Sequence, residues 1–354
     1  MKTLKYIFML TIPFFFLSTA SASDQSKQSE YKPARNAQGH PDIQGIWDFR
    51  SLTPLERPKG LGDKAVFTPE EEEAYRAKVT QVNDTDNKKD LDLPAEFDVE
   101  VPYNNFWLDY GTAMNEDRRT SLIVDPANGR LPALTPEAVA GMKNYQQREL
   151  PVRDYFSIGL STFRPEGPES LGLSERCMVG FNAGPPLIPS AYNNNLRIIQ
   201  AANYIVLFTE MVHDARIVPM DGRPHLASEF EKWTGDSRGH WDGDTLVVET
   251  TNFTDKTPTY QLPLSEAGQV GVVGSGKNLH LVEKFTRTSE SQLIYEYTVT
   301  DPTTFTRPFT VAIPLRATED QIFEYACHEG NHAMVGMLGG ARQLEKEAAT
   351  ATAN

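Results

Sequence analysis

The chain has 354 residues, enough for one large or two ordinary domains with a sizeable core. Its 34 Lys and Arg residues are outnumbered by 48 Asp and Glu residues, which gives a formal net charge of −14 at pH 7. This balance argues against nucleic-acid partners, whose phosphates are neutralised by Lys and Arg, and against binding to anionic membrane surfaces.

The first 22 residues have the pattern of a secretory signal peptide. Lys2 and Lys5 form a basic start, residues 6–17 are mainly apolar, and residues 20–22 are a small-residue cleavage site. The apolar run is shorter than the roughly 20 residues that span a bilayer. We therefore predict cleavage after Ala22 and a periplasmic or secreted protein without membrane insertion. A retained N-terminal anchor is the alternative.

Residues 23–40 are polar and are predicted to form a flexible tail. Residues 41–195 are predicted to be a loop-rich part with short helices that packs on the domain after it. In this part, residues 43–49 have the composition of a first strand. Thr68 is followed by a proline and two acidic residues, which marks the start of a helix that runs to about Lys78.

Further along the same part, residues 120–124 are predicted to form a short strand. Thr135 repeats the helix-start pattern and leads a helix into the 140s. Residues 151–195 are rich in Pro, Gly and Asn. Long loops of this kind inside a compact domain are often functional, and a linker between two domains is the alternative.

Residues 196–340 are predicted to form an antiparallel β domain. This part contains seven runs rich in Val, Ile, Thr, Tyr and Phe, most of them separated by turn residues. The runs are 196–200, 204–218, 244–253, 279–288, 292–300, 309–315 and 322–328. Short strands at this spacing favour a mainly β fold, an antiparallel barrel or sandwich that is lipocalin-like in general terms. Residues 341–354 are small and polar and are expected to be disordered.

Two cysteines are present, Cys177 and Cys327. In an oxidising compartment they most simply form one disulfide. This disulfide would close a loop of about 150 residues, worth roughly 4–5 kcal/mol in the chain-entropy model. Two free buried thiols are the alternative.

Residues 212–253 are the part of the chain richest in groups that transfer protons or bind anions. If residues 204–218 form one strand, their side chains alternate between two faces. His213 is then the one ionisable group on a face that looks into the barrel, where desolvation would keep it neutral as a general base. A core histidine bonded to a carbonyl is the alternative. Asp214 and Arg216 would form a surface ion pair on the other face.

Charged groups downstream can complete an acid–base site. Asp236 or Glu329 would orient the histidine base or act as the acid, and Arg223 or Arg238 would stabilise developing negative charge. The structural alternatives are that Arg223 pairs with Asp221 or Asp236, and that Asp236 and Arg238 hold their loop. The expected substrate-binding residues are Arg223, His225, Arg238, Trp241 and His328.

His328, Glu329 and His332 have the spacing of a zinc-protease motif, in which two histidines lie on one face of a helix. Residues Gly330 and Asn331 are poor helix formers, and no third ligand has a suitable spacing. A zinc site is therefore a weak alternative. We expect a strand end instead, with His328 and Glu329 near the mouth of the pocket.

Eight stretches carry a resemblance that covers most of the mature chain. They are PDIQGIWDF, SLIVDPANGRLPALTP, ERCMVGFNAGPP, YNNN, HDARIVPMDGRPH, GDSRGHWDGDTLVVETTNF, DPTTFTRPF and EYACHEGN. Together they resemble a family of exported bacterial proteins of uncharacterised function. The resemblance implies export and a single integrated fold, and it implies no activity. One departure is His332, where the pattern has an aromatic residue, so the zinc-like spacing is interpreted as accidental.

These patterns support three functional hypotheses. The first is an exported enzyme that works without a cofactor and performs acid–base chemistry on a small organic molecule, as a lyase, isomerase or hydrolase. The second is a periplasmic binding protein that carries an apolar or aromatic ligand in a lipocalin-like barrel. The third is a zinc hydrolase at His328 and His332. The density of ionisable groups favours the first.

Overall fold

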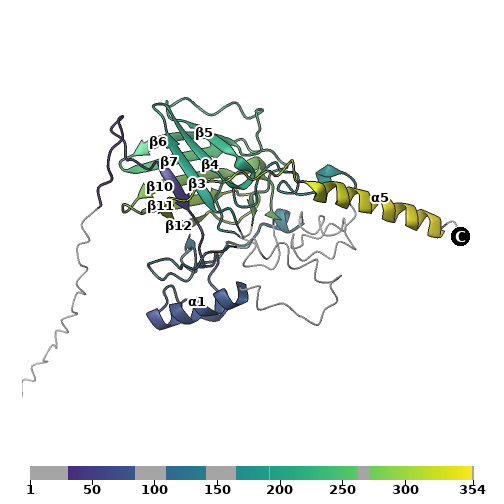
Figure 1. Cartoon of the computed structure of the whole chain (residues 1–354), viewed down its shortest axis with the longest axis horizontal. Coiled ribbons are helices and arrows are strands. Elements are labelled where there is room, and N and C mark those ends of the chain that lie inside the picture. The colour runs from purple at the N-terminus through teal and green to yellow at the C-terminus, as the bar shows by residue number, and fades with distance from the viewer. Residues whose placement is uncertain (1–30, 84–108, 141–164, 191, 262–271, 353–354) are drawn as a thin grey trace, which may run out of the picture. The chain divides into compact units, whose positions relative to one another are not determined.

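The computed structural model describes residues 31–83, 109–140, 165–190, 192–261 and 272–352. The chain divides into two compact units, Met1–Lys32 and Pro33–Asn354, and all helices and strands of the described residues belong to the second (Figure 1). The predicted signal peptide, residues 1–22, lies outside the described residues. In the described part of the chain, no helix is long and apolar enough to cross a bilayer.

One antiparallel sheet of ten strands forms the body of the fold (Figure 1). Nine strands follow in the order β5-β4-β3-β1-β12-β11-β10-β7-β6, and β2 also pairs with β12. The ten strands are β1 Gly45–Asp48, β2 Ile123–Asp125, β3 Asn195–Gln200, β4 Tyr204–Thr209, β5 Ala215–Pro219, β6 Asp236–Asp242, β7 Thr245–Thr251, β10 His280–Arg287, β11 Gln292–Thr300 and β12 Phe309–Thr318. Strands β8 Tyr260–Gln261 and β9 Val272–Val273 form a separate small sheet.

The two predicted parts of the chain share this sheet. β1 comes from the part 41–195 and lies between β3 and β12, both of which come from the part 196–340. Residues 33–40, which were expected to belong to a flexible tail, also contact the sheet. Arg35 donates to Asp244 in the β6–β7 turn at 2.6 Å, and the ring of His40 stacks on Trp241 with centroids 5.2 Å apart.

Two α-helices and four short 3-10 helices lie wholly within the described residues, and residues 136–140, after the predicted start at Thr135, are also helical. The former are α1 Pro69–Asn83, α5 His332–Thr352, η1 Lys59–Leu61, η4 Pro168–Ser170, η5 Met211–His213 and η6 Gly276–Asn278. α1 begins where predicted because Thr68 and Glu71 form a capping box: Glu71 N–H donates to Thr68 Oγ1, and Thr68 N–H donates to Glu71 Oε2. α5 contradicts the disorder expected after residue 340. Its end is rich in Ala, Glu, Lys and Gln, which are strong helix formers.

Alternation along the strands produces the core. In β11, Leu293, Tyr295, Tyr297 and Val299 are each at most 1% exposed, and the residues between them are partly exposed. Pairing with β10 places Phe285 opposite Tyr295. Successive side chains of a strand point to opposite faces, so this pattern buries one face of the sheet. Each fully buried apolar side chain contributes about 1.5–3 kcal/mol.

The predicted barrel is not closed. β5 and β6 are the two ends of the strand order, and no hydrogen-bonded ladder joins them within the described residues. They meet through side chains instead: a Cβ added to Gly239 in β6 would lie 2.9 Å from Cγ1 of Val218 in β5. β5 also ends at Pro219, which has no N–H to donate to a further strand. The mainly β, antiparallel prediction is confirmed, but the sheet is open.

The chain itself covers the buried face of the sheet. Leu187 and Ile188, from the loop before β3, belong to the main core cluster, and the N–H of Leu187 donates to the hydroxyl of Tyr295 at 3.1 Å. A void of about 10 Å³ remains between residues 183–187, β3, β4 and Arg216. This is roughly the space of one water molecule. The hollow in which a barrel would hold its ligand is therefore filled by protein.

The predicted disulfide between Cys177 and Cys327 is present, with the two Cα atoms 5.7 Å apart and a sequence separation of 150 residues. A disulfide is compatible with an exported protein. The run 322–328, predicted as a strand, has no strand pairing. It is held by the disulfide and by a hydrogen bond from the N–H of Phe323 to Oε1 of Glu210, at 3.1 Å.

Candidate functional site

The predicted strand 204–218 is a hairpin. β4 and β5 pair with each other, and Leu207 lies opposite Arg216. The turn between them contains Val212 at φ 59° and His213 at φ 44°. These values lie in the left-handed region, which is rare for residues other than glycine and especially for a β-branched one. The turn interrupts the alternation of side chains between the two faces of the sheet. The faces assigned to residues 204–218 from the sequence are therefore correct only up to Thr209.

His213 therefore lies in a turn at the surface. Its side chain is exposed, and its Nδ1 is 3.0 Å from the carbonyl oxygen of Tyr325. The expectation that this ring looks into a hollow of the sheet is wrong, and the argument for a desolvated general base loses its premise. The hydrogen bond to a carbonyl agrees with the structural alternative, although the ring is not in the core.

Arg216 points inward rather than outward. Two nitrogens of its guanidinium donate to the carboxylate of Glu283, one of them to Oε1 at 2.9 Å. Tyr295 donates its hydroxyl hydrogen to the same Oε1 at 2.7 Å, and burial raises the pKa of this tyrosine. The expected surface pair of Asp214 and Arg216 is thus replaced by a buried pair with satisfied hydrogen bonds, and its role is structural.

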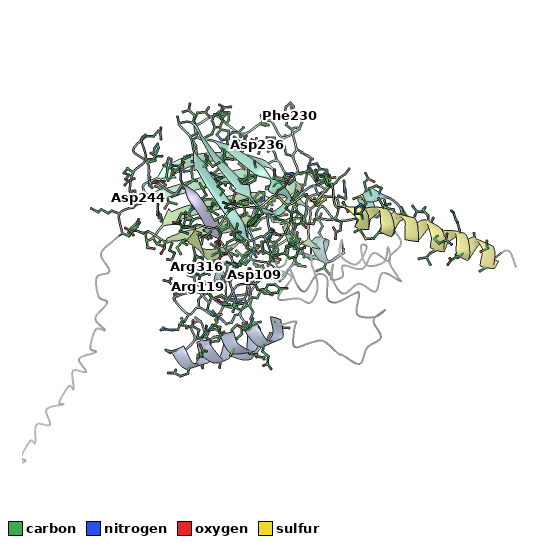
Figure 2. The ribbon with its side chains drawn as sticks, in the orientation of Figure 1. Asp109, Arg119, Phe230, Asp236, Asp244 and Arg316 are labelled. Atoms are coloured by element: carbon green, nitrogen blue, oxygen red, sulfur yellow. A yellow bond between two sulfur atoms is a disulfide. The ribbon has the colours of Figure 1, made fainter. Side chains whose placement is uncertain are left out.

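Asp236, labelled in Figure 2, is the centre of a second satisfied cluster. Its buried carboxylate accepts from the N–H of Leu226 at 3.0 Å, from Lys232 at 3.0 Å and from Arg238 at 2.9 Å, and it lies 3.3 Å from Nδ1 of His225. Burial acts to raise the pKa of Asp236, but these hydrogen bonds hold it below its ordinary value. The arrangement agrees with the alternative that Asp236 and Arg238 hold their loop.

Two further expected site residues, Arg223 and Trp241, have structural contacts of their own. Arg223 pairs with Asp221 and donates to the hydroxyl of Tyr204, as its structural alternative predicts. Trp241 is half-buried and stacks on His40. The residues expected to share one pocket are thus divided between two paired clusters and exposed positions.

The zinc-like spacing also falls on irregular structure. His328 and Glu329 lie exposed in a turn, whereas His332 is the first residue of α5. The two histidines therefore do not lie on one face of a helix, which the motif requires. No cluster of three or more potential metal ligands occurs in the described part of the chain.

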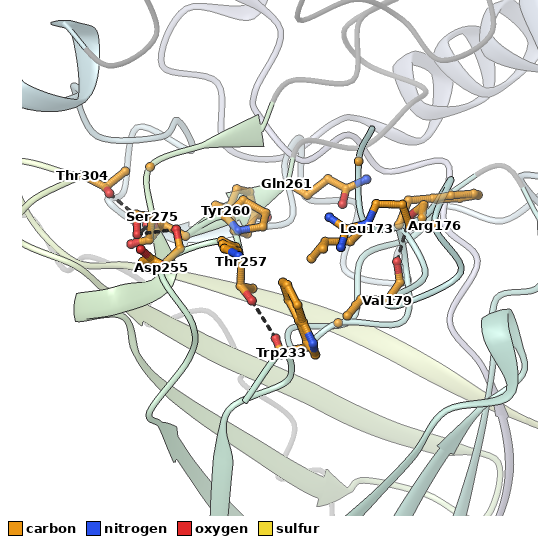
Figure 3. A pocket seen from close by; sticks show the side chains of 18 of the residues that line it. Leu173, Arg176, Val179, Trp233, Asp255, Thr257, Tyr260, Gln261, Ser275 and Thr304 are labelled. Carbon is orange, nitrogen blue, oxygen red and sulfur yellow. Dashed lines mark hydrogen bonds between the residues drawn. The ribbon is translucent and has the colours of Figure 1, made fainter. Parts of the chain in front are cut away.

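A cavity of about 1270 Å³ lies elsewhere, and none of the expected catalytic or substrate-binding residues lines it. Its walls come from Glu137 and Ala138, the loop 166–188, Trp233, residues 255–261, residues 274–275 and residues 303–304. This loop belongs to the stretch 151–195, which was expected to be either functional or a linker. In Figure 3, Trp233 lies between one wall with Leu173, Arg176 and Val179 and another with Thr257 and Tyr260.

Arg176 and Trp233 form the most distinctive contact of the cavity. The guanidinium carbon of Arg176 lies 5.7 Å from the centroid of the Trp233 ring. The position of Trp233 is fixed by a hydrogen bond from Thr257 Oγ1 to its carbonyl, at 2.9 Å (Figure 3). A cation–π contact uses none of the N–H donors of the guanidinium, so this wall can bind an anion.

A group of hydroxyls forms another part of the wall. Thr259, Thr303 and Thr304 line the cavity and donate to the carboxylate of Asp301 behind them, at 2.5, 2.6 and 2.9 Å. Burial acts to raise the pKa of Asp301, but these hydrogen bonds lower it. A Cβ on Gly274 would collide with Thr259 and Thr304. This wall is therefore preformed and neutral on the cavity side.

The acidic residues of the cavity stand at its rim. Glu137, Glu166, Glu169 and Asp255 line it but are exposed, as is Lys256. Water and salt screen exposed charges strongly. Arg176 is half-buried, so its charge acts on a ligand more strongly than the rim does.

Glu175 is the most perturbed carboxyl near the cavity. Its Oε2 is buried without a hydrogen-bond partner in the described residues, and burial raises its pKa to about 7. Burial also raises the pKa of Tyr192, to which Tyr325 contributes by a hydrogen bond. Glu175 does not line the cavity itself, but its neighbours Ser174 and Arg176 do.

Sequence reasoning singled out neither Arg176 nor Glu175. One available signal was their position directly before Cys177, since a disulfide fixes the backbone beside it. Trp233 lies in the stretch 212–253, which was singled out for its ionisable groups and not for this tryptophan. Comparison of the chain with models of protein families, with curated proteins and with solved structures found no match.

Proposed function

We propose that the mature chain is a periplasmic or secreted protein that binds a small organic molecule in the cavity beside Trp233. The observation that carries the proposal is the cation–π pair Arg176–Trp233 in the wall of a cavity of about 1270 Å³. A concave site with many apolar residues and a few placed polar groups is the usual form of a small-molecule site. The disulfide is consistent with export.

The ligand-carrying role is the one expected of a lipocalin-like barrel, but the proposed position of the ligand is different. In a barrel the ligand lies between the strands. Here Leu187 and its neighbours fill that space, so the site is assigned to the loops next to the sheet. Leu173 and Val179 supply apolar surface there, and the threonine hydroxyls, whose hydrogens are donated to Asp301, supply hydrogen-bond acceptors.

A titration with N-phenyl-1-naphthylamine, an uncharged aromatic dye, tests this function. Leu173→Trp places a large ring in the cavity and should weaken dye binding at least tenfold. The matched control is Ile217→Trp, on a residue that is 60% exposed and does not line the cavity. Thermal unfolding should confirm that both variants fold. Absence of dye binding to the wild type, or equal binding by both variants, would contradict the proposal.

An acid–base enzyme is the second candidate, and Glu175 favours it. Carboxyls with a pKa near neutral are typical of acid–base catalysts, although buried structural groups show such values too. Native mass spectrometry of protein purified from its own host should reveal a retained molecule. Incubation of that molecule with the wild type and with Glu175→Gln would then show whether it is converted. Conversion that is unaffected by the substitution would exclude this role for Glu175.

A further inference from the structure

We propose that the ligand is a small organic anion with a flat apolar body, and that Arg176 binds its anionic group. This inference rests on the proposed binding function and names the class of ligand. It assigns the charged end of the ligand to the guanidinium and the apolar end to the surface formed by Leu173 and Val179.

The first support is the pairing state of Arg176. Within the described residues its guanidinium makes no hydrogen bond or ion pair, and it lies over the ring of Trp233 in a cation–π contact. A guanidinium has five N–H donors, and a half-buried charge without a partner is unfavourable. By contrast, Arg216 and Arg238 are bonded to carboxylates. An anion in the cavity would provide the acceptors that Arg176 lacks.

The second support is that Arg176 is held in place before any ligand binds. The adjacent Cys177 is joined to Cys327, and the N–H of Arg176 donates to the carbonyl of Gly172 at 3.2 Å. The guanidinium carbon also lies over the Trp233 ring, 5.7 Å from its centroid. Little side-chain freedom is then lost on binding, and such preorganisation increases affinity. A planar guanidinium also matches the two oxygens of a carboxylate.

The third support is the distribution of charge in the cavity. The buried Asp301 is satisfied by three threonines, and the acidic side chains that line the cavity are exposed at its rim. Arg176 is the half-buried charge of the lining. The interior therefore favours a negative group at this one position, and the lining next to it combines apolar side chains with uncharged hydroxyls.

A matched pair of dyes tests the inference. N-phenyl-1-naphthylamine and 1-anilinonaphthalene-8-sulfonate share one aromatic body, and only the second carries an anionic group, which stands in for the anion of the ligand. Arg176→Gln should weaken binding of the sulfonate by about tenfold or more, because a hydrogen bond to a charged group is lost. Binding of the uncharged dye should change less than twofold. Arg176→Lys should keep part of the sulfonate affinity.

Arg197→Gln is the control, since Arg197 is exposed on β3 and does not line the cavity. It should leave both dyes unaffected. Binding of the uncharged dye together with unchanged sulfonate binding in Arg176→Gln would overturn the inference and leave the proposed function intact. An equal loss of both dyes in that variant would also overturn it, because the effect would then be one of shape. If neither dye binds the wild type, the proposed function fails and the inference fails with it.

Discussion

Two charged regions of the molecule differ in how completely their charges are paired. Around Asp236, one carboxylate is shared by Lys232, Arg238 and the backbone of Leu226, with His225 beside it. In the cavity, Arg176 has an aromatic ring below it and no acceptor among the described residues. The first region was singled out from the sequence because of its density of charge. A high density of charged residues in the sequence is found both in structural clusters, where every charge is paired, and in binding sites. Only the pairing seen in the structure distinguishes the two.

The buried pair Arg216–Glu283 is the extreme case of a satisfied charge, and breaking it should have the largest effect. Arg216→Met leaves the carboxylate of Glu283, which is 0% exposed, without its partner. We expect a loss of about 3–5 kcal/mol in the free energy of unfolding. Denaturant unfolding would measure it. The double variant Arg216→Met with Glu283→Leu should recover most of the loss. If the single variant costs less than about 1 kcal/mol, the pair is not a structural element.

Glu175 offers a second test, because its burial in the folded protein destabilises the ionised form of its carboxyl group. Its pKa rises from 4.5 to about 7 on folding, so both states are protonated below pH 4.5. Between these values the unfolded chain releases the proton and the folded chain keeps it, so stability falls as the pH rises. The loss should reach roughly 2–3 kcal/mol above pH 7, after a discount for partial exposure of the residue.

Unfolding of the wild type and of Glu175→Gln, followed from pH 4.5 to pH 8, would measure this contribution. The variant should lose less stability with pH, since the amide does not ionise. Glu169→Gln, which removes an exposed carboxylate, is the control for the change in net charge. Parallel curves for the wild type and Glu175→Gln would mean that the carboxyl is solvated in the folded protein.

The sequence predicted most of the sheet because alternation is a local signal. β10, β11 and β12 follow it closely, and the capping box of α1 is also encoded within a few residues. The β4–β5 turn was missed because Val212 and His213 occupy its left-handed positions, where glycine or asparagine would have signalled a turn. Without that turn, His213 was placed on the wrong face.

The candidate site was less predictable than the fold. Arg176 and Trp233 are far apart in the sequence, and their contact depends on how the loop 166–188 packs beside the sheet. No periodicity or spacing encodes a contact of this kind. The sequence did indicate that the loop was of interest, since a long Pro- and Gly-rich segment in a compact domain is unusual. It gave no sign that the hollow of the sheet would be filled by Leu187.

The smallest expected effects on stability come from removing one arginine in each region. These two substitutions also compare the Asp236 cluster and the cavity most directly. Arg238→Gln removes a guanidinium that contacts Asp236, the carbonyl of Pro224 at 2.9 Å and the carbonyl of Ser237 at 2.7 Å. It should cost about 1–3 kcal/mol of stability, because it leaves part of a buried network unsatisfied. Arg176→Gln removes one stacking contact and should cost less than about 1 kcal/mol.

Chemical denaturation of the two variants under the same conditions would give both values. A ligand-binding arginine is expected to be dispensable for folding, since its partner is absent from the free protein. If Arg176→Gln destabilises the chain as much as Arg238→Gln does, then Arg176 is a structural residue and the contrast between the two regions does not hold. A loss of sulfonate binding without a loss of stability would instead separate function from folding at this position.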